Sequence, residues 1–168
     1  MDTPAISIES MTVEDVDESV DLINRAMNPS EGQWAQRTMD YHFTCQRQGI
    51  DDGRTYYVWR LNDRIAGLVG LHHYLWGPDS NVWLSWFAVD PSVQRQGYGR
   101  RLLAVIEDNA RKQGYRQFLV ETYNSSDFDA ARAFYRTQGF EQVGHIKGYL
   151  PDGSDMIVYG KNLSASHI

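Results

Sequence analysis

The chain has 168 residues, which suits one compact domain and leaves too little length for two domains of ordinary size. Apolar residues make up 42% and charged residues 23%, which excludes a disordered chain, and no apolar run approaches the ~20 residues of a membrane helix. The net charge of −6 argues against binding to nucleic acid, and Cys45, as the single cysteine, excludes an internal disulfide or a cysteine-based zinc site.

These features predict a cytoplasmic protein without a metal. Residues 1–10 lack the basic start and the apolar core of a secretion signal. We expect one domain over residues 1–163 and a flexible, serine-containing tail over residues 164–168. The acidic composition also suits a cationic binding partner, such as an amine, better than an anionic one.

The N-terminal part of the chain predicts a strand followed by two helices. Residues 5–11 alternate apolar and polar side chains, as in a strand. Thr12 followed by Asp15 is a capping-box pattern, after which apolar residues recur at helical spacing. Residues 28–30 (Asn-Pro-Ser) are expected to break that helix, and residues 31–48 predict a second one with many aromatic side chains.

The middle of the chain predicts three strands. Residues 54–61 and 65–75 are rich in β-branched and aromatic side chains, and the intervening Asn62-Asp63 is typical of a hairpin turn. Residues 81–89 have the same character and predict a further strand.

The remaining elements alternate between helix and strand and end in a hairpin. The periodicity predicts helices over residues 99–113 and 126–138, the latter opened by a second capping-box pattern, with a strand over 117–123 between them. Residues 140–149 and 156–161 predict the closing hairpin. This order indicates an α/β (α+β) fold with a mixed sheet.

Residues 86–103 form the most informative segment, in which an apolar strand leads through a loop into a Gly-x-Gly turn and an amphipathic helix. Gly97 and Gly99 are expected to let the backbone approach an anion closely and to adopt φ values denied to other residues. The first N–H groups of a helix have no intrahelical partner, and the helix dipole favours negative charge there. The segment therefore predicts a cradle for phosphate or pyrophosphate.

Three phosphate-binding patterns compete for this segment. The P-loop pattern Gly-x-x-x-x-Gly-Lys-Ser/Thr does not occur. A dinucleotide fingerprint requires a third glycine where Leu102 stands, and it belongs near the start of a βαβ unit. The pattern Arg/Gln-x-x-Gly-x-Gly/Ala is matched in full by Gln94-Arg95-Gln96-Gly97-Tyr98-Gly99.

With this signature the chain resembles the GNAT superfamily of N-acetyltransferases. Residues 131–140 carry a second signature, similar to the family's Ala-x-x-Phe-Tyr-x-x-x-Gly-Phe, and the element order is that of the family. The resemblance implies a mixed, mostly antiparallel twisted sheet of about seven strands, flanked by about four helices and with a splayed central strand pair. It also implies acetyl-CoA as the acyl donor. An unrelated α/β domain with a glycine turn is the alternative.

The resemblance further implies which residues bind acetyl-CoA. The pantetheine arm would pair with backbone groups of the splayed strand at Phe87, Ala88 and Val89. The pyrophosphate would lie on backbone amides of Arg95, Gln96, Gly97, Tyr98, Gly99 and Arg100. Asn124 matches a position where an asparagine often contacts the cofactor arm, although a loop or capping role is equally open.

Tyr135 matches the family's general acid. Attack of an amine on a thioester creates an oxyanion and then expels a thiolate, which a phenol with a pKa of ~10 can protonate. The alternative is a core tyrosine whose hydroxyl lies at the edge of the pocket.

The general base is harder to assign. Many relatives use a glutamate on the strand before the glycine loop, but residues 83–86 offer no carboxylate. Glu121 on the following strand is the best remaining candidate, acting through water, and a structural ion pair with an arginine is its alternative. His72 and His73 face opposite sides of a strand, so at most one can serve as base, and a structural role is open for both.

The amine acceptor would bind among aromatic side chains, unless these residues pack in the core or in a homodimer interface: Trp34, Tyr41, Phe43, Tyr74 and Trp76. Tyr149, Asp152 and Asp155 of the last hairpin are further candidates. The expected function is acetylation of a small-molecule or peptide amine by direct attack in a ternary complex. Acetylation of a protein lysine or N-terminus, and a catalytically idle domain that senses acyl-CoA, are the alternatives.

Overall fold

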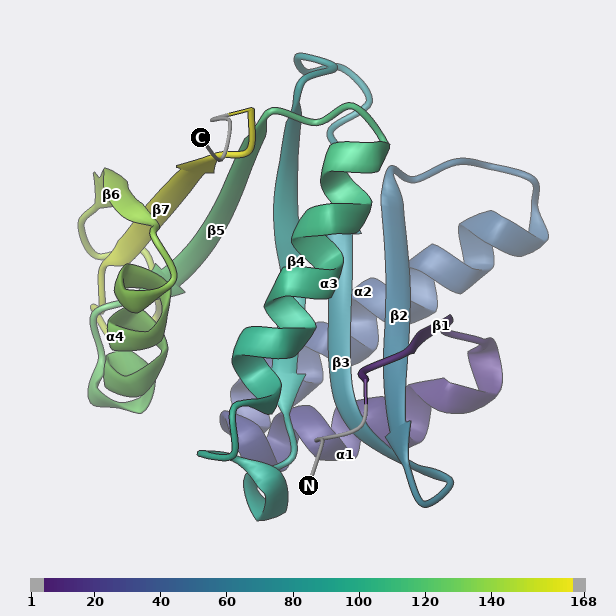
Figure 1. Ribbon diagram of the computed structural model, residues 1–168. Coiled ribbons are helices and arrows are strands. Elements are labelled where there is room, and N and C mark those ends of the chain that lie inside the picture. Colours follow the sequence, from purple (N-terminus) through teal and green to yellow (C-terminus); the bar gives the residue numbers. More distant parts are fainter. Residues whose placement is uncertain (1–4, 165–168) are drawn as a thin grey trace.

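The computed structural model describes residues 5–164, in which seven strands form one sheet of order β1-β2-β3-β4-β5-β7-β6 (Figure 1). All neighbouring strands are antiparallel except β4 and β5, which are parallel. The strands are β1 (Ile8–Ser10), β2 (Arg54–Leu61), β3 (Arg64–His72), β4 (Asn81–Val89), β5 (Gln117–Tyr123), β6 (Glu141–Ile146) and β7 (Met156–Asn162). The predicted fold class is confirmed. Apart from Ser164, the predicted tail lies outside the described residues.

Four helices cover the two faces of this sheet (Figure 1). They are α1 (Val16–Ala26), α2 (Pro29–Arg47), α3 (Tyr98–Lys112) and α4 (Asp129–Thr137). The apolar stripes of α1 and α2 pack on one face, and those of α3 and α4 pack on the other. β3 alternates between the two cores, with Leu68 in one and Val69 in the other, as the period of two along a strand requires. None of the helices within residues 5–164 combines the length and the apolar character needed to cross a bilayer.

The start of α2 differs from the sequence prediction. Asn28 caps this helix, because its side-chain oxygen accepts a hydrogen bond from the Glu31 N–H at 2.9 Å, and Pro29 occupies the first turn. Proline is tolerated there because its missing N–H has no intrahelical partner in any case. The Asn-Pro-Ser segment therefore separates the two helices, as predicted, but it also begins the second helix, which the prediction started only at residue 31.

Two other local predictions had different outcomes. The Thr12–Asp15 capping box forms, with the Thr12 N–H donating to the Asp15 carboxylate at 3.0 Å. The capping box predicted at Ser126 does not form, and a 3-10 turn (Ser126–Phe128) precedes α4, whose first residue, Asp129, pairs with Arg132.

The central strand pair separates along its length. β4 and β5 pair only over Asn81–Trp83 and Gln117–Leu119, after which β5 continues beside β7 (Figure 1). The remainder of β4 therefore has no strand partner on its β5 side. This separation is the predicted splay, and it positions the candidate site.

Candidate active site

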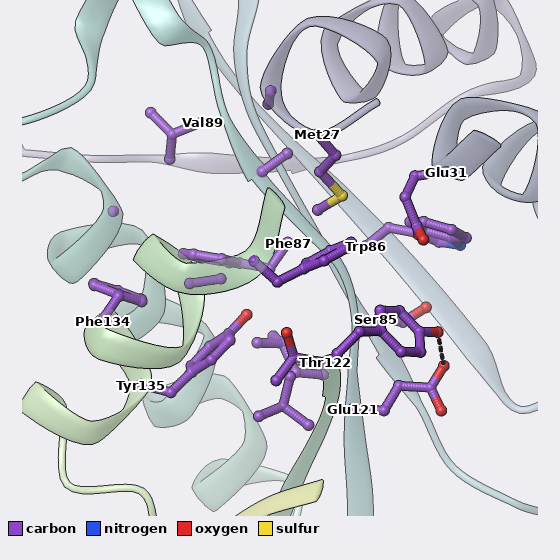
Figure 2. A pocket seen from close by; sticks show the side chains of 18 of the residues that line it. Met27, Glu31, Ser85, Trp86, Phe87, Val89, Glu121, Thr122, Phe134 and Tyr135 are labelled. Atoms are coloured by element: carbon purple, nitrogen blue, oxygen red, sulfur yellow. Dashed lines mark hydrogen bonds between the residues drawn. The ribbon is translucent and has the colours of Figure 1, made fainter. Parts of the chain in front are cut away.

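A cavity of about 1120 Å³ occupies the gap between β4 and β5 (Figure 2). Its wall includes the second half of β4, the loop into α3, β5, α4, the first turns of α2 and the loop before β7. The cavity contains a buried hydroxyl without a partner, Thr122 Oγ1. Buried polar groups in proteins are normally hydrogen-bonded, so a ligand in this cavity has a free hydroxyl available to bond, among the described residues.

A bulge in β4 shapes the middle of the cavity. Two residues, Trp86 and Phe87, stand opposite the single residue Val69 of β3. Trp86 has a φ of +48°, which costs a non-glycine residue about 1–3 kcal/mol, and its indole N–H donates to Thr38 Oγ1 at 2.7 Å. Phe87, Ala88 and Val89 all line the cavity. The bulge thus interrupts the pairing of β4 with β3 at Trp86 and Phe87.

The loop before α3 is where the sequence predicts an anion cradle. Arg95 and Gly97 both have left-handed backbone conformations, with φ values of +62° and +80°. Gln94 Nε2 donates to the Val89 carbonyl at 2.9 Å and so fixes the loop against the end of β4. Arg95, Gly97, Gly99 and Arg100 line the cavity, where the first N–H groups of α3 lack intrahelical acceptors.

Other predicted cradle residues have different environments. Gln96 and Tyr98 do not line the cavity, and the Tyr98 ring packs on Trp59 with centroids 4.7 Å apart. Gly99 does not have a positive φ, contrary to expectation; a Cβ added there would meet only ordinary contacts, with Phe134 at 3.8 Å and Val89 at 4.0 Å. A Cβ at Gly99 would therefore fit without strain, and of the two glycines only Gly97 is needed for its backbone conformation.

The side chain of Tyr135 reaches the cavity from α4. Its ring packs among aromatic residues such as Phe87 and Phe140, with centroids 6.5 and 5.5 Å away. Within residues 5–164 nothing hydrogen-bonds its hydroxyl, which points toward Phe87 in Figure 2. Burial raises the pKa of this phenol, so it is protonated at neutral pH and available as a proton donor.

Glu121 lines the cavity from β5, and its side chain lies on the face of that strand opposite to the side chain of Thr122. Thr122, the next residue, lies between it and Tyr135 in Figure 2. The Tyr123 hydroxyl donates to Glu121 Oε1 at 3.4 Å, and desolvation by the surrounding protein raises the pKa of the carboxyl. No arginine or lysine among residues 5–164 forms an ion pair with Glu121. The predicted acid and base candidates therefore stand on two sides of one cavity.

The model of the Acetyltransferase (GNAT) family matches residues 19–140. The chain belongs to the GNAT acetyltransferase family. An N-alpha-acetyltransferase RimI of Mycobacterium tuberculosis is 36% identical over 90 residues, which are 54% of each chain. The chain spans about half the length of the curated relatives it matches first, between 40% and 54%.

Solved GNAT structures share the fold along nearly the whole chain. A putative GNAT acetyltransferase from Desulfovibrio desulfuricans superposes with a TM-score of 0.82 at 24% identity, covering 95% of this chain and all of the other. A GNAT acetyltransferase from Elizabethkingia anophelis, solved with acetyl-CoA bound, gives a TM-score of 0.70 at 22% identity, covering 95% and 99%.

Glu31 is the residue of this GNAT site that sequence reasoning missed. It lies in the first turn of α2, it is only 5% exposed, and it lines the cavity (Figure 2). Burial, and then the charge of Glu121, raise the pKa of its carboxyl to about 7. An acidic residue at a helix start is explained by the helix dipole alone, so no sequence signal separates Glu31 from an ordinary first-turn glutamate.

The histidines are poorly suited to act as base. His72 lines the cavity, but burial and the neighbouring Arg54 lower its pKa to about 4. His73 is not part of the cavity wall; its Nδ1 lies 3.2 Å from the Asn81 carbonyl oxygen, and its ring packs on Tyr115.

Asn124 lies outside the cavity wall, and its side-chain oxygen accepts a hydrogen bond from the Asp155 N–H at 2.8 Å. Asp155 also pairs with His145 at 2.6 Å. This geometry favours an anchoring role for Asn124 beside the last hairpin over the predicted contact with the cofactor.

The aromatic candidates for the acceptor site lie in three environments: the cavity wall, the core and the exposed surface. Trp34, Tyr74 and Tyr149 line the cavity. Phe43 is buried in the core between α2 and the sheet, whereas Tyr41 and Trp76 are 58% and 85% exposed outside the cavity.

Proposed function

We propose that this GNAT protein transfers the acetyl group of acetyl-CoA to an amine by direct attack, with both substrates bound at once. The observation that carries this proposal is a single cavity. It joins the anion cradle at the start of α3 to Tyr135 on one wall and Glu121 on another. Family membership supports acyl transfer in general, and this arrangement supports the specific roles.

The cradle and the free side of β4 are the parts that fit acetyl-CoA. Backbone N–H groups around Gly97 and Gly99 would hold the pyrophosphate, and Arg95 and Arg100 add positive charge at the cavity wall. The side of β4 that has no strand partner beyond Trp83 would hold the pantetheine arm. Acetyl-CoA supplies a thioester, whose carbonyl carbon is attacked and whose sulfur leaves as a thiolate.

Backbone N–H groups at the β4 bulge are placed to stabilise negative charge on the carbonyl oxygen, since the β3 ladder is interrupted there. Tyr135 then protonates the departing sulfur. Burial raises the pKa of this phenol, and a thiolate expelled beside it would be desolvated by the same surroundings, so the pKa values of donor and acceptor would rise together.

Glu121 is the proposed acceptor for the proton that the ammonium must lose before it can attack. An alkylammonium has a pKa of ~10, so at neutral pH it binds in its charged form. A carboxylate with a raised pKa is a stronger base than one with an ordinary pKa. Glu121 is exposed by area, but the protein around it raises the pKa of its carboxyl by desolvation.

A second cavity supports an acceptor with an extended body over a compact amine. It has a volume of about 320 Å³ and shares Glu31 and Trp34 with the first cavity. It reaches exposed residues at Ser30, Asp127 and Asp152, between the start of α2 and the loop before β7. A peptide amine would fit this path, and the similarity to an N-alpha-acetyltransferase points the same way.

Steady-state release of free CoA tests the proposal. The assay uses saturating acetyl-CoA and a panel of small amines, polyamines, amino acids and short peptides. Acceptor-dependent release that is lost in Tyr135→Phe supports the transferase. Tight binding of acetyl-CoA, with no acceptor raising release above hydrolysis, overturns it in favour of a catalytically idle acyl-CoA-binding domain.

A further inference from the structure

Glu31 is a buried carboxyl for which the structure provides no partner. Only its backbone N–H is bonded, to the Asn28 cap, and within residues 5–164 nothing donates a hydrogen bond to its carboxyl or forms an ion pair with it. Only 5% of the residue is exposed. Glu31 nevertheless lines both cavities. Its carboxyl oxygens are not among the fully buried unpartnered atoms of the described residues, so they keep access to the cavities, where a cationic ligand or a proton would stabilise the group.

The like charge that raises the pKa of the Glu31 carboxyl is that of Glu121. Figure 2 shows the two side chains on the same side of the cavity, away from Tyr135. Both carboxylates also act on the Tyr123 hydroxyl, whose pKa is raised first by burial, then by Glu121 and then by Glu31. Three groups close enough to influence one another electrostatically therefore meet at this end of the cavity.

Other ionisable groups around Glu31 do not neutralise it. The remaining ones on the cavity walls at α2, β2, β3, β5 and the adjoining loops are Arg54, His72, Tyr74, Asp127, Tyr149 and Asp152. Arg54, the cation among them, pairs with Asp52 at 3.4 Å, and His72 is neutral at pH 7 because its pKa is about 4. The acceptor end of the cavity therefore has excess negative charge.

We propose that Glu31 and Glu121 form a carboxyl pair that binds the acceptor as its ammonium and takes up the proton that this ammonium must lose, with Glu31 as the final holder. The inference rests on the proposed function, because the pair acts on the amine substrate of acetyl transfer. Glu31 is buried, whereas Glu121 is exposed by area, and the charge of Glu121 disfavours ionisation of Glu31. The two carboxyls are therefore expected to titrate as a coupled pair, and an entering cation lowers the cost of their charge.

The protons balance over one turnover. The ammonium passes its first proton through Glu121, directly or by water, to Glu31, and the free amine attacks the thioester. Tyr135 gives its phenolic proton to the departing sulfur. The attacking nitrogen loses its second proton as the amide forms, and this proton restores the Tyr135 phenol. Glu31 then releases the first proton to solvent. The net products are the acetylated amine, free CoA and one proton.

The test compares wild type, Glu31→Gln and Glu121→Gln with Asp40→Asn, a matched loss of charge on the exposed face of the same helix. kcat/KM for the acceptor is measured against pH at saturating acetyl-CoA, together with the Kd for acetyl-CoA. For wild type and Asp40→Asn we expect a rising limb near pH 7.

In Glu31→Gln we expect that limb to move to lower pH, the acceptor KM to rise about tenfold and the Kd for acetyl-CoA to stay unchanged. A wild-type limb and KM in Glu31→Gln overturn the proposal. A pH-independent loss of activity with weakened acetyl-CoA binding also overturns it, because it indicates a merely structural role.

Carboxyl ¹³C NMR titration of the resting protein tests the pair without turnover. The pair is supported if Glu31 and Glu121 titrate together in wild type and Glu121 titrates as a single group in Glu31→Gln. Independent titration of the two groups overturns it. If wild type shows no acceptor-dependent release of CoA, the proposed function fails, and this titration still decides whether the carboxyl pair exists.

Discussion

Replacing Glu31 with glutamine removes an ionisable group that folding places in an unfavourable environment. Folding raises the pKa of this carboxyl from 4.5 to about 7, first through burial and then through the charge of Glu121. A carboxyl whose pKa is raised in the folded state contributes stability that is present below pH 4.5 and is lost as the pH rises through about 7.

The size of the effect follows from this shift. Each pKa unit corresponds to about 1.4 kcal/mol, so ionisation of Glu31 is expected to cost the folded state about 3 kcal/mol at about pH 8 and almost nothing at about pH 4. Glutamine has nearly the same shape and no charge. The free energy of unfolding of Glu31→Gln minus that of wild type should therefore increase by about 3 kcal/mol between these two pH values.

The measurement is denaturant unfolding, followed by circular dichroism at several pH values, with Asp40→Asn as the exposed control on α2. The absolute difference at one pH also contains the cost of burying a glutamine amide, so only its pH dependence is diagnostic. A difference that stays constant with pH to within about 1 kcal/mol would refute the reasoning, because Glu31 would then ionise in the fold as easily as in the unfolded chain.

Three other substitutions test separate parts of the site. Tyr135→Phe should lower kcat by about tenfold to a thousandfold and keep the Kd for acetyl-CoA, as loss of a general acid does; unchanged turnover in steady-state assays would remove Tyr135 from the mechanism. Gly99→Ala should leave the Tm unchanged, because its Cβ meets only ordinary contacts, but weaken acetyl-CoA binding in calorimetry at least about tenfold; intact binding would contradict the cradle. Asp90 has its pKa lowered to about 2, since hydrogen bonds from Arg25 and the Ser92 N–H outweigh the opposing effect of burial. Its contribution to stability is thus lost as the pH falls from about 4 to about 2, and in acid unfolding Asp90→Asn should remove that part of the pH dependence; an unaltered acid transition would argue against it.

Local physical chemistry made much of the fold predictable. Helical periodicity and strand composition placed the four helices and the seven strands of the described residues. Apolar residues at helical spacing indicate a helix with one buried face, and runs of β-branched residues indicate a strand buried on one or both faces. The turn around Gly97 was also predictable, since a positive φ is a property of the backbone at that residue. The Asn28 cap was within reach in principle, because capping involves only neighbouring residues.

The cavity could not be predicted from local patterns alone. The positive φ of Trp86 arises where a bulge in β4 faces β3, and it is supported by a hydrogen bond to Thr38 on α2, 48 residues away in the sequence. The residues that meet at the site come from elements separated by long stretches of chain. Family resemblance supplied the predicted role of Tyr135, and Glu121 was the best remaining carboxylate on the next strand. Only the tertiary structure brought the two side chains to one cavity.

Sequence by itself therefore determined the family, the order of the elements and the glycine turn at the start of α3, because each depends on residues close together in the chain. Tertiary structure alone decided the electrostatics of the acceptor end. Glu31 is an ordinary first-turn glutamate until α2 packs on the sheet, which buries it and brings it near Glu121. Desolvation and like-charge repulsion depend on the surrounding volume, and that volume exists only once distant segments have packed together.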